Sequence, residues 1–174
     1  VWPEVPAETQ KELALLQERN AKSDFEEVKR VISTEIPNQE MAQFIVAHLE
    51  PEPLGVGTIG EVYKSQLPND RVIVVKVITR SKEFNFLTTL DKVNQVKSLL
   101  RLYQTDLPYA SQAIRFIEMF QGMTKNELDL KNEVQNALHF QKLFGATFEV
   151  PHHFVEYSSS KVEVQEFLSG SILA

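Results

Sequence analysis

Cysteine is absent from the 174-residue sequence, which excludes disulfides, thiolate metal sites and a thiol nucleophile. Its absence also fits a reducing, intracellular compartment. Apolar runs are short: the run "VIVV" over Val72–Val75 falls far below the length needed to span a bilayer. The first residues lack the basic and apolar regions of a signal peptide. With 24 acidic and 18 basic residues, the net charge of −6 argues against a broad nucleic-acid surface.

The hydrophobic and charged fractions, 43% and 24%, are those of a globular domain. Residue periodicity predicts helices over 7–20, 25–36, 38–48, 84–103, 110–123 and 126–144, and strands over 58–67, 71–78, 153–157 and 161–167. Because the strand pairs have short links, we expect a mainly antiparallel sheet and an α+β fold. We divide the chain into a helical extension over 1–50 and a lobe over 51–174, with a helical insert at about 84–123.

The stretch "LGVGTIGEVYK" places Gly55, Gly57 and Gly60 in a G-x-G-x-x-G pattern. A dinucleotide-binding turn requires a helix directly after the glycines, but a strand pattern and a hairpin follow here. A Walker A loop is excluded because no Gly-Lys-Ser/Thr follows. Two interpretations remain: an ordinary tight turn, or a kinase-type phosphate loop, G-x-G-x-x-G-x-V, with Val62 in the last position.

A kinase-type loop requires a strand lysine one hairpin later to neutralise phosphate charge. Lys76 stands in the middle of the apolar strand "IVVKVI", on the same face as Val74 and Ile78. An edge-strand lysine that blocks aggregation is the alternative. The glycine loop at the correct spacing favours the phosphate-binding interpretation.

A partly buried lysine also needs an acidic partner, and Glu127 and Glu133 are the candidates. Asp129 and Glu133 share one face of the predicted helix at i, i+4 spacing. Glu127 lies where an acid favours the helix dipole and where it can pair with Lys131. The pattern therefore favours Glu133 as the partner of Lys76, with a solvated charged helix as the alternative.

Together these segments resemble the UbiB family of atypical kinases, also called aarF-domain-containing kinases. The resemblance covers nearly the whole chain and is carried by "FEEVKRVI", "EPLGVGTIGEVYKSQLPNDRVIVVKV", "ELDLKNEVQNALHF" and "VPHHFVEYSSSKVEVQEFLSG". It implies a protein-kinase-like N-terminal lobe in which two extra helices fill the interval between Lys76 and Glu133.

The resemblance implies that Lys76 holds nucleotide phosphates and that Glu133 pairs with it, both as catalytic residues. Glu127 and Asp129 would be the acids of the family's E-x-D motif. Glu166 to Leu168 would form the hinge that meets adenine. The implied nucleotide-binding residues are Gly55, Val56, Gly57, Thr58, Gly60, Val62, Val74, Lys76, Glu127, Asp129, Glu166, Phe167 and Leu168.

The implied ligand is ATP or ADP with Mg, whose metal ligands are expected mostly in a second lobe. We expect no metal site in this chain, because the adjacent His152 and His153 would point to opposite faces of a strand. The catalytic Asp, the metal-binding Asn and the D-F-G motif of kinases are also expected in that second lobe. Whether the protein is an enzyme therefore depends on residues outside this sequence.

Several positions depart from the family pattern. The loop has glycines at Gly55 and Gly57 where the family has alanines, and Glu61 replaces a glutamine. A carboxylate at Glu61 is expected to weaken phosphate binding unless it points away. Val74 replaces an alanine that packs on adenine, which would narrow the adenine slot.

The resemblance implies a kinase or ATPase that supports ubiquinone or isoprenoid-lipid metabolism in a mitochondrion, plastid or bacterial cell. Lipid or membrane-associated biosynthetic proteins are the implied partners, besides the nucleotide. The alternative is a degenerate pseudokinase that acts as a protein- or lipid-binding module. For the helices over 84–123, we expect Phe84, Phe86, Phe116 and Phe120 in the core rather than against a membrane or partner.

Overall fold

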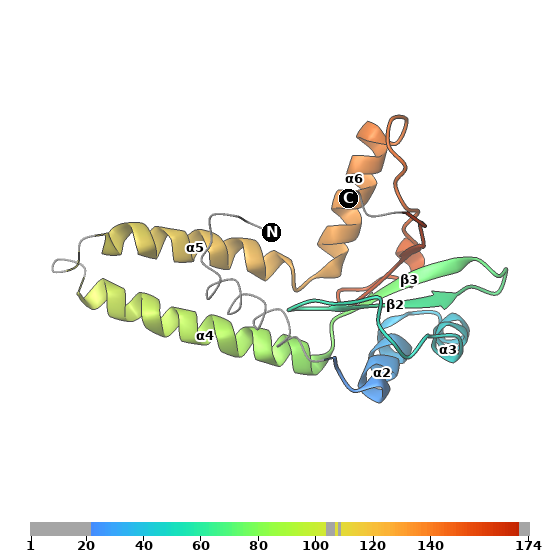
Figure 1. Ribbon diagram of the computed structural model, residues 1–174, viewed down its shortest axis with the longest axis horizontal. Helices are drawn as coiled ribbons and strands as arrows, with labels where there is room; N and C mark the ends of the chain where they lie inside the picture. Colours follow the sequence, from blue (N-terminus) through green and yellow to red (C-terminus); the bar gives the residue numbers. More distant parts are fainter. Residues whose placement is uncertain (1–21, 104–106, 108, 171–174) are drawn as a thin grey trace, which may run out of the picture.

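The computed structural model describes residues 22–103, 107 and 109–170, so the predicted helix over 7–20 lies outside the described part. Figure 1 shows a small sheet with helices on both sides and a two-helix arm that projects from it. In chain order the elements are α2 (Phe25–Glu35), α3 (Gln39–Ala47), β1 (Gly55–Val56), β2 (Glu61–Gln66), β3 (Val72–Val77), α4 (Arg80–Leu102), α5 (Ala110–Asn126), α6 (Leu130–Phe144), the 3-10 helix η1 (Val155–Tyr157) and β4 (Val162–Glu166). The predicted α+β class is confirmed.

The sheet is antiparallel throughout, with the strand order β1-β2-β3-β4. Its register places Lys76 of β3 between Val62 of β2 and Glu163 of β4. A short turn joins β2 to β3, and Asp70 adopts a positive φ of 61° there, a conformation that aspartate tolerates well. Lys76 therefore lies on the central strand β3, with a paired strand on each side.

The hydrophobic core lies between the sheet and the α2–α3 pair, which covers one face (Figure 1). Asp24 and Asn38 cap these two helices by accepting hydrogen bonds from backbone N–H groups. Val28, Ile32 and Ile45 are fully buried against the strands. Burial of each such side chain contributes about 1.5–3 kcal/mol to stability. Because these side chains pack in one core with those of the sheet, the described part of the predicted extension, from residue 22 on, shares the core of the lobe.

Helix α6 lies on the opposite side of the sheet from α2 and α3 (Figure 1). The predicted single helix over 126–144 is wrong at its start, because α5 runs on to Asn126 and α6 begins only at Leu130. The Asp129 carboxylate caps α6 by accepting a hydrogen bond from the Lys131 N–H. Glu127 therefore lies in the α5–α6 connection, not in the first turn of α6.

The predicted strand over 153–157 is also wrong. Only His153 forms a bridge, to Gln165 of β4, and residues Val155–Tyr157 turn into η1. The Tyr157 N–H donates to the Phe154 carbonyl, which closes the turn. Phe154 is buried in the core while Val155 is exposed. This alternation of buried and exposed residues resembles that of a strand, although no strand forms here.

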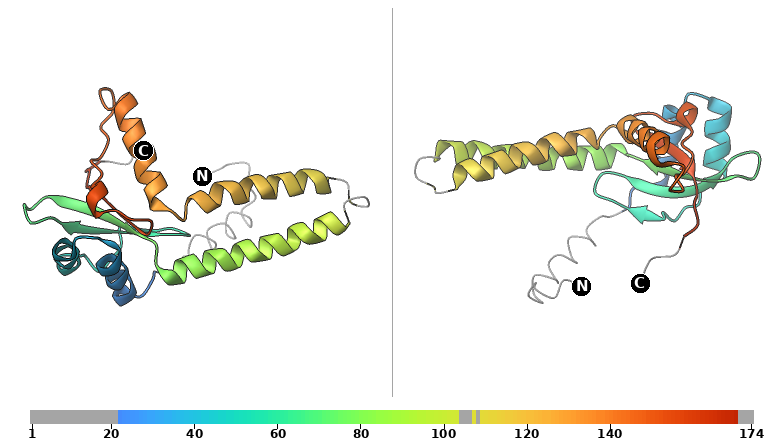
Figure 2. Two further views of the ribbon diagram at one scale, coloured as in Figure 1. Left: turned by 180° about the vertical axis from the view of Figure 1, so that it is seen from behind. Right: turned by 90° about the horizontal axis from the view of Figure 1, so that it is seen from above.

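Helices α4 and α5 pack antiparallel as an arm that extends away from the sheet (Figure 2). Thr79 caps α4, which therefore starts earlier than the predicted residue 84. Arg101 of α4 pairs with Glu118 of α5 at 2.5 Å. Phe86 is buried as expected, but Phe84, Phe116 and Phe120 are exposed, which corrects their placement in the core. No helix in the described part of the chain is long and apolar enough to cross a membrane.

Candidate functional site

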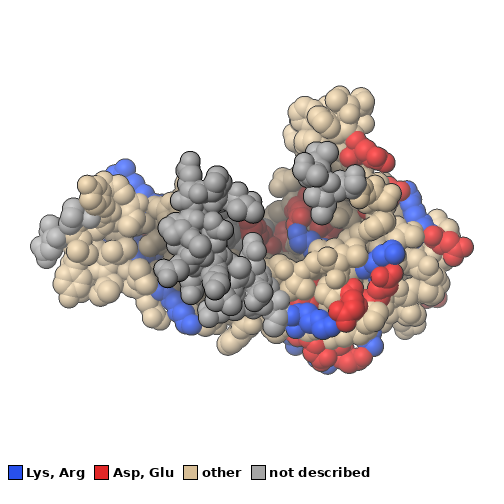
Figure 3. Space-filling model, in the orientation of Figure 1, with Lys and Arg blue, Asp and Glu red and all other residues tan. Residues whose placement is uncertain are grey.

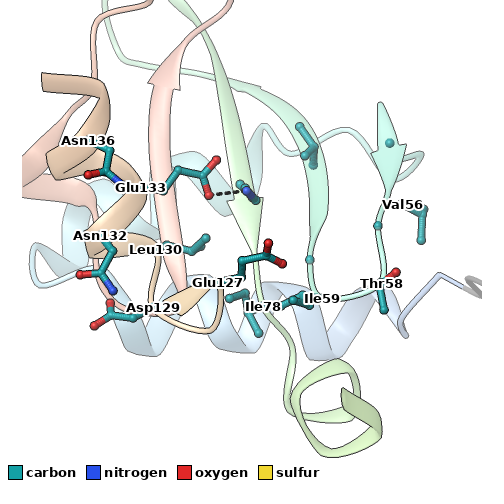
Figure 4. Close-up of a pocket in the computed structure, with 15 residues that line it drawn as sticks. Val56, Thr58, Ile59, Ile78, Glu127, Asp129, Leu130, Asn132, Glu133 and Asn136 are labelled. Carbon is teal, nitrogen blue, oxygen red and sulfur yellow. Dashed lines mark hydrogen bonds and ion pairs between the residues drawn. The ribbon is translucent and has the colours of Figure 1, made fainter. Parts of the chain in front are cut away.

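A cleft of about 780 Å³ lies between the glycine-rich hairpin, β3 and the start of α6 (Figure 4). It is lined by Gly55, Val56, Gly57, Thr58, Ile59, Gly60, Val62, Lys76, Ile78, Glu127, Asp129, Leu130, Asn132, Glu133 and Asn136. The structure thus gathers residues from three separate stretches of the sequence around one space, and most of them are predicted site residues.

The Lys76 Nζ lies 2.5 Å from Glu133 Oε2, which forms the ion pair that the helix pattern favoured (Figure 4). The two side chains remain 29% and 51% exposed toward the cleft. An ion pair with this exposure contributes only about 0–1 kcal/mol to stability. The geometry therefore orients the ammonium in the cleft more than it holds the fold together.

The start of α6 is fixed from two sides, and this places Glu133. Leu130 is buried, and its N–H donates to the Ser160 carbonyl at 3.0 Å. Lys161 Nζ contacts Glu83 Oε1 of α4 at 2.6 Å and the Leu128 carbonyl at 3.4 Å. The segment from Glu127 to Asp129 is thereby held along the edge of the cleft.

The glycine-rich hairpin forms the opposite wall. Its turn is closed by the Gly57 N–H, which donates to the Gly60 carbonyl at 2.8 Å. A Cβ on Gly60 would lie 3.2 Å from the Val77 carbonyl, so glycine lets the hairpin approach β3 closely. A Cβ on Gly55 would meet nothing within 4 Å. At Gly55 and Gly60 the hairpin backbone can therefore be approached closely, with no side chain in between.

Glu61 points away from the cleft, so its carboxylate is not placed to repel a phosphate bound there. Its buried side chain lies on the core face of β2 with Tyr63, opposite Val77. Its carboxylate accepts hydrogen bonds from the N–H and hydroxyl of Ser23 and from the Tyr63 hydroxyl at 2.6 Å. Burial, together with this bond to Glu61, raises the pKa of Tyr63 well above its ordinary value.

Four predicted nucleotide contacts do not line the cleft: Val74, Glu166, Phe167 and Leu168. Val74 is buried in β3, and the N–H groups of Glu166 and Phe167 donate to the carbonyls of His152 and Val72. The hydrogen bond from Arg71, followed by that from the His152 N–H, lowers the pKa of Glu166. The roles of these four residues stay predictions.

Five cleft residues were missed by sequence reasoning: Ile59, Ile78, Leu130, Asn132 and Asn136. The two asparagines follow Asp129 at three and seven positions, so they share its side of α6 (Figure 4). That helical stripe was readable in the sequence. Their amides add neutral hydrogen-bonding groups to a wall that otherwise carries carboxylates.

The cleft combines the Lys76 ammonium with several carboxylates, so it offers partners both to an anionic group and to a cation. The Lys76 ammonium and the hairpin amides are donors, and the hairpin glycines leave room beside them. Among the described residues, no group of three His, Cys, Asp or Glu side chains is placed to hold a metal. On the face shown in Figure 3, acidic and basic side chains are interspersed over the lobe.

Comparison with known proteins gives consistent matches. The model of the ABC1 atypical kinase-like domain family matches residues 15–174. A chloroplastic aarF domain-containing protein kinase of Arabidopsis thaliana is 28% identical over 93% of this chain and 23% of its own length. The chloroplastic protein ACTIVITY OF BC1 COMPLEX KINASE 3 of the same plant is 29% identical over 97% of this chain and 24% of its own length.

A probable protein kinase UbiB of Xylella fastidiosa is 26% identical over 95% of this chain and 30% of its own length. The chain thus spans between 23% and 30% of the length of these relatives. Among solved structures, a Mycobacterium tuberculosis protein in complex with erythromycin matches with a TM-score of 0.68, 19% identity and coverage of 95% of this chain and 41% of that chain. At that identity the likeness shows the fold.

Proposed function

This chain belongs to the ABC1 atypical kinase-like family, and we propose that it forms the ATP- or ADP-binding lobe of an atypical kinase or ATPase. The family match confirms the resemblance to UbiB and aarF kinases that the motifs carry. The observation that carries the proposal is the Lys76–Glu133 ion pair at 2.5 Å, which faces a cleft beneath a glycine-rich hairpin.

The phosphates of the nucleotide would lie between Lys76 and the hairpin. The Lys76 ammonium neutralises phosphate charge, and the Glu133 carboxylate keeps the ammonium in the cleft rather than in bulk water. Hairpin amides near Gly57 donate further hydrogen bonds to phosphate oxygens. When bound with ATP, Mg²⁺ would neutralise part of the phosphate charge, and its remaining ligands are expected in a second lobe.

Adenine would lie toward the hinge, beyond the part of the cleft that Val62 lines. The N–H groups of Glu166 and Phe167 are already engaged within the protein, so adenine would contact other backbone groups of the segment up to Leu168. Glu127 and Asp129 lie at the opposite edge of the cleft, where their carboxylates repel an incoming phosphate unless a cation accompanies it. This supports a nucleotide that binds with Mg.

We propose a cellular compartment and a metabolic role for the whole protein from those of its relatives. Their names place two of them in chloroplasts and one, UbiB, in a bacterium. We infer a plastid or bacterial setting and a role in supporting ubiquinone or isoprenoid-lipid metabolism. Partners in that role would be lipid-processing, membrane-associated proteins.

A second candidate function is favoured by the arm. Phe84, Leu99, Leu102 and Phe116 on α4 and α5 are each more than half exposed, so the arm offers large apolar side chains for contact with a partner. A pseudokinase would use such a surface to bind protein or lipid, and its cleft would be folded like that of a kinase but would not bind nucleotide. Nucleotide binding separates the two functions.

The test is thermal stabilisation of the full-length protein by Mg-ATP, with Lys76→Ala beside the wild type. A ligand at 100 times its Kd stabilises the native state by about 2.7 kcal/mol, which gives a clear rise in Tm. We expect the rise in the wild type, its loss in Lys76→Ala and its retention in Lys92→Ala, which removes an exposed lysine from α4. Equal stabilisation of Lys76→Ala and the wild type would overturn the site assignment, and no stabilisation of the wild type would favour the pseudokinase.

A further inference from the structure

We propose that Lys82 is a positioning residue that fixes the glycine-rich hairpin from outside the cleft and directs one of its amides toward the nucleotide phosphates. The inference deepens the proposed function and rests on it for its consequence for nucleotide affinity. The contact itself stands independently of that function.

Lys82 lies in the first turn of α4, and only 8% of its side chain is exposed. Its Nζ donates a hydrogen bond to the Gly57 carbonyl at 3.1 Å. The same ammonium lies 3.6 Å from Glu61 Oε1. Gly57 precedes the tip of the hairpin and Glu61 follows it, so one buried ammonium holds both sides of the turn.

Lys82 does not line the nucleotide cleft, whereas Gly57 and Thr58 do. A second cavity, lined by Lys82 and Thr58 among other residues, lies on the outer side of the hairpin. In a trans peptide the carbonyl and the following N–H point in opposite directions. Because Lys82 draws the Gly57 carbonyl outward, the Thr58 N–H faces inward, toward the phosphates.

The base of α4 holds Lys82 firmly. Thr79 Oγ1 accepts a hydrogen bond from the Lys82 N–H, and the Ser23 hydroxyl contacts both Thr79 Oγ1 and Glu61. The N–H and hydroxyl of Ser81 donate to the Glu27 carboxylate of α2. The position of the hairpin is therefore set by α2 and α4, two elements outside the cleft.

The buried charges explain why Lys82 cannot be exchanged in isolation. A buried carboxylate such as Glu61 is costly unless charged or hydrogen-bonded partners surround it. Glutamine at position 61, as in the resembled family, would need no ammonium nearby. The double variant Glu61→Gln/Lys82→Met therefore removes both charges together and separates the effect of charge pairing from the effect of the Gly57 contact.

The experiment uses the full-length protein in four forms: wild type, Lys82→Met, Glu61→Gln/Lys82→Met, and Lys92→Met as a control on the same helix. Titration with Mg-ATP and with adenosine measures affinity. Amide hydrogen exchange over residues 55–62, without nucleotide, measures the order of the hairpin. Thermal unfolding of each form reports stability.

We expect the double variant to unfold near the wild-type Tm but to bind Mg-ATP about tenfold more weakly, the size of one lost hydrogen bond. Its affinity for adenosine should stay unchanged, and exchange over residues 55–62 should be faster. Wild-type exchange and wild-type ATP affinity in the double variant would overturn the proposal and leave Lys82 as a charge partner of Glu61 alone.

Two further outcomes are distinguishable. If the wild type binds no nucleotide, the proposed function fails. The positioning role is then judged from hydrogen exchange alone, and unchanged exchange over residues 55–62 in the double variant would overturn it. Where Lys82→Met does not fold because Glu61 is left unpaired, the double variant still carries both measurements.

Discussion

The Lys76 ammonium and the Glu133 carboxylate lie 2.5 Å apart although 57 positions separate them in the sequence. Most of that interval is the α4–α5 arm, which leaves the sheet after β3 and returns to it before α6 (Figure 1). The start of the arm is held by contacts of Ser81 with Glu27 and of Glu83 with Lys161, and Lys161 also donates to the Leu128 carbonyl just after the arm ends. The insertion therefore lengthens the chain without displacing the ion pair.

Glu133→Gln should lower the affinity for Mg-ATP about tenfold and change the free energy of unfolding by less than about 1 kcal/mol, because the pair is partly exposed. The glutamine cannot hold the Lys76 ammonium by charge. Isothermal titration and urea unfolding measure the two quantities. Glu118→Gln is the matched control, since it removes an acid of similar exposure from an ion pair of the same length, with Arg101, in the arm. Equal affinity of Glu133→Gln and wild type would contradict the role of the pair.

The residues that sequence reasoning placed well are those whose chemistry is conspicuous against their surroundings. Lys76 is a charge in an apolar strand, and the register of the sheet carries it to the cleft. Glu133 follows from helical spacing. Glu127 was placed in the wrong element because the helix pattern runs through Asp129, which in fact ends the connection by capping α6. A capping hydrogen bond competes with a helical one, and residue types alone do not show which forms.

Glu61 is a residue whose type the sequence shows but whose surroundings it does not. The sequence identifies a carboxylate next to the phosphate loop, but only the fold shows that the strand turns it into the core beside Ser23 and Tyr63. Its partners lie 38 positions before it and two after it. The contribution of Lys82 was unreadable for the same reason: it depends on how the base of α4 meets the hairpin.

Gly60→Ala should destabilise the lobe by about 1–3 kcal/mol, because the added Cβ would lie 3.2 Å from the Val77 carbonyl and close to Ile78. Gly55→Ala is the matched control in the same hairpin, where a Cβ meets open space. It should change the unfolding free energy by no more than about 0.5 kcal/mol. Urea denaturation of both variants measures this difference. Similar losses at the two positions would contradict the close approach of the hairpin to β3.

Arg71→Gln should raise the pKa of Glu166 back toward its ordinary value of 4.5, because the Arg71 hydrogen bond is the main cause of its lowering. A lowered pKa in the folded state adds stability above the unfolded pKa, and this stability is lost as the pH falls through the folded pKa. The variant should therefore lose less stability on acidification. An NMR titration of the Glu166 carboxyl carbon measures the shift, with Lys64→Gln as the control that removes the pair with Glu50. An unchanged pKa in Arg71→Gln would refute the assigned cause.

Tyr63→Phe removes the hydroxyl that donates to buried Glu61 Oε2 at 2.6 Å. Leaving that carboxylate short of a donor should cost about 1–3 kcal/mol at neutral pH. The pKa of Tyr63 is raised above its ordinary value of 10.0, so above that pH the unfolded chain releases a proton that the folded protein keeps. Wild-type stability should therefore fall as the pH rises through 10.0, and the variant should lose this part of the fall.

Urea denaturation at neutral pH and above the ordinary pKa of tyrosine tests both parts of this prediction. Tyr157→Phe is the control, because that ring is half-buried and stacks on Phe154 at a centroid distance of 6.0 Å. It should retain the alkaline loss of stability that Tyr63→Phe removes. If Tyr63→Phe is as stable as the wild type at neutral pH, the Glu61 carboxylate does not depend on the hydroxyl, and the Ser23 and Lys82 contacts suffice to hold it.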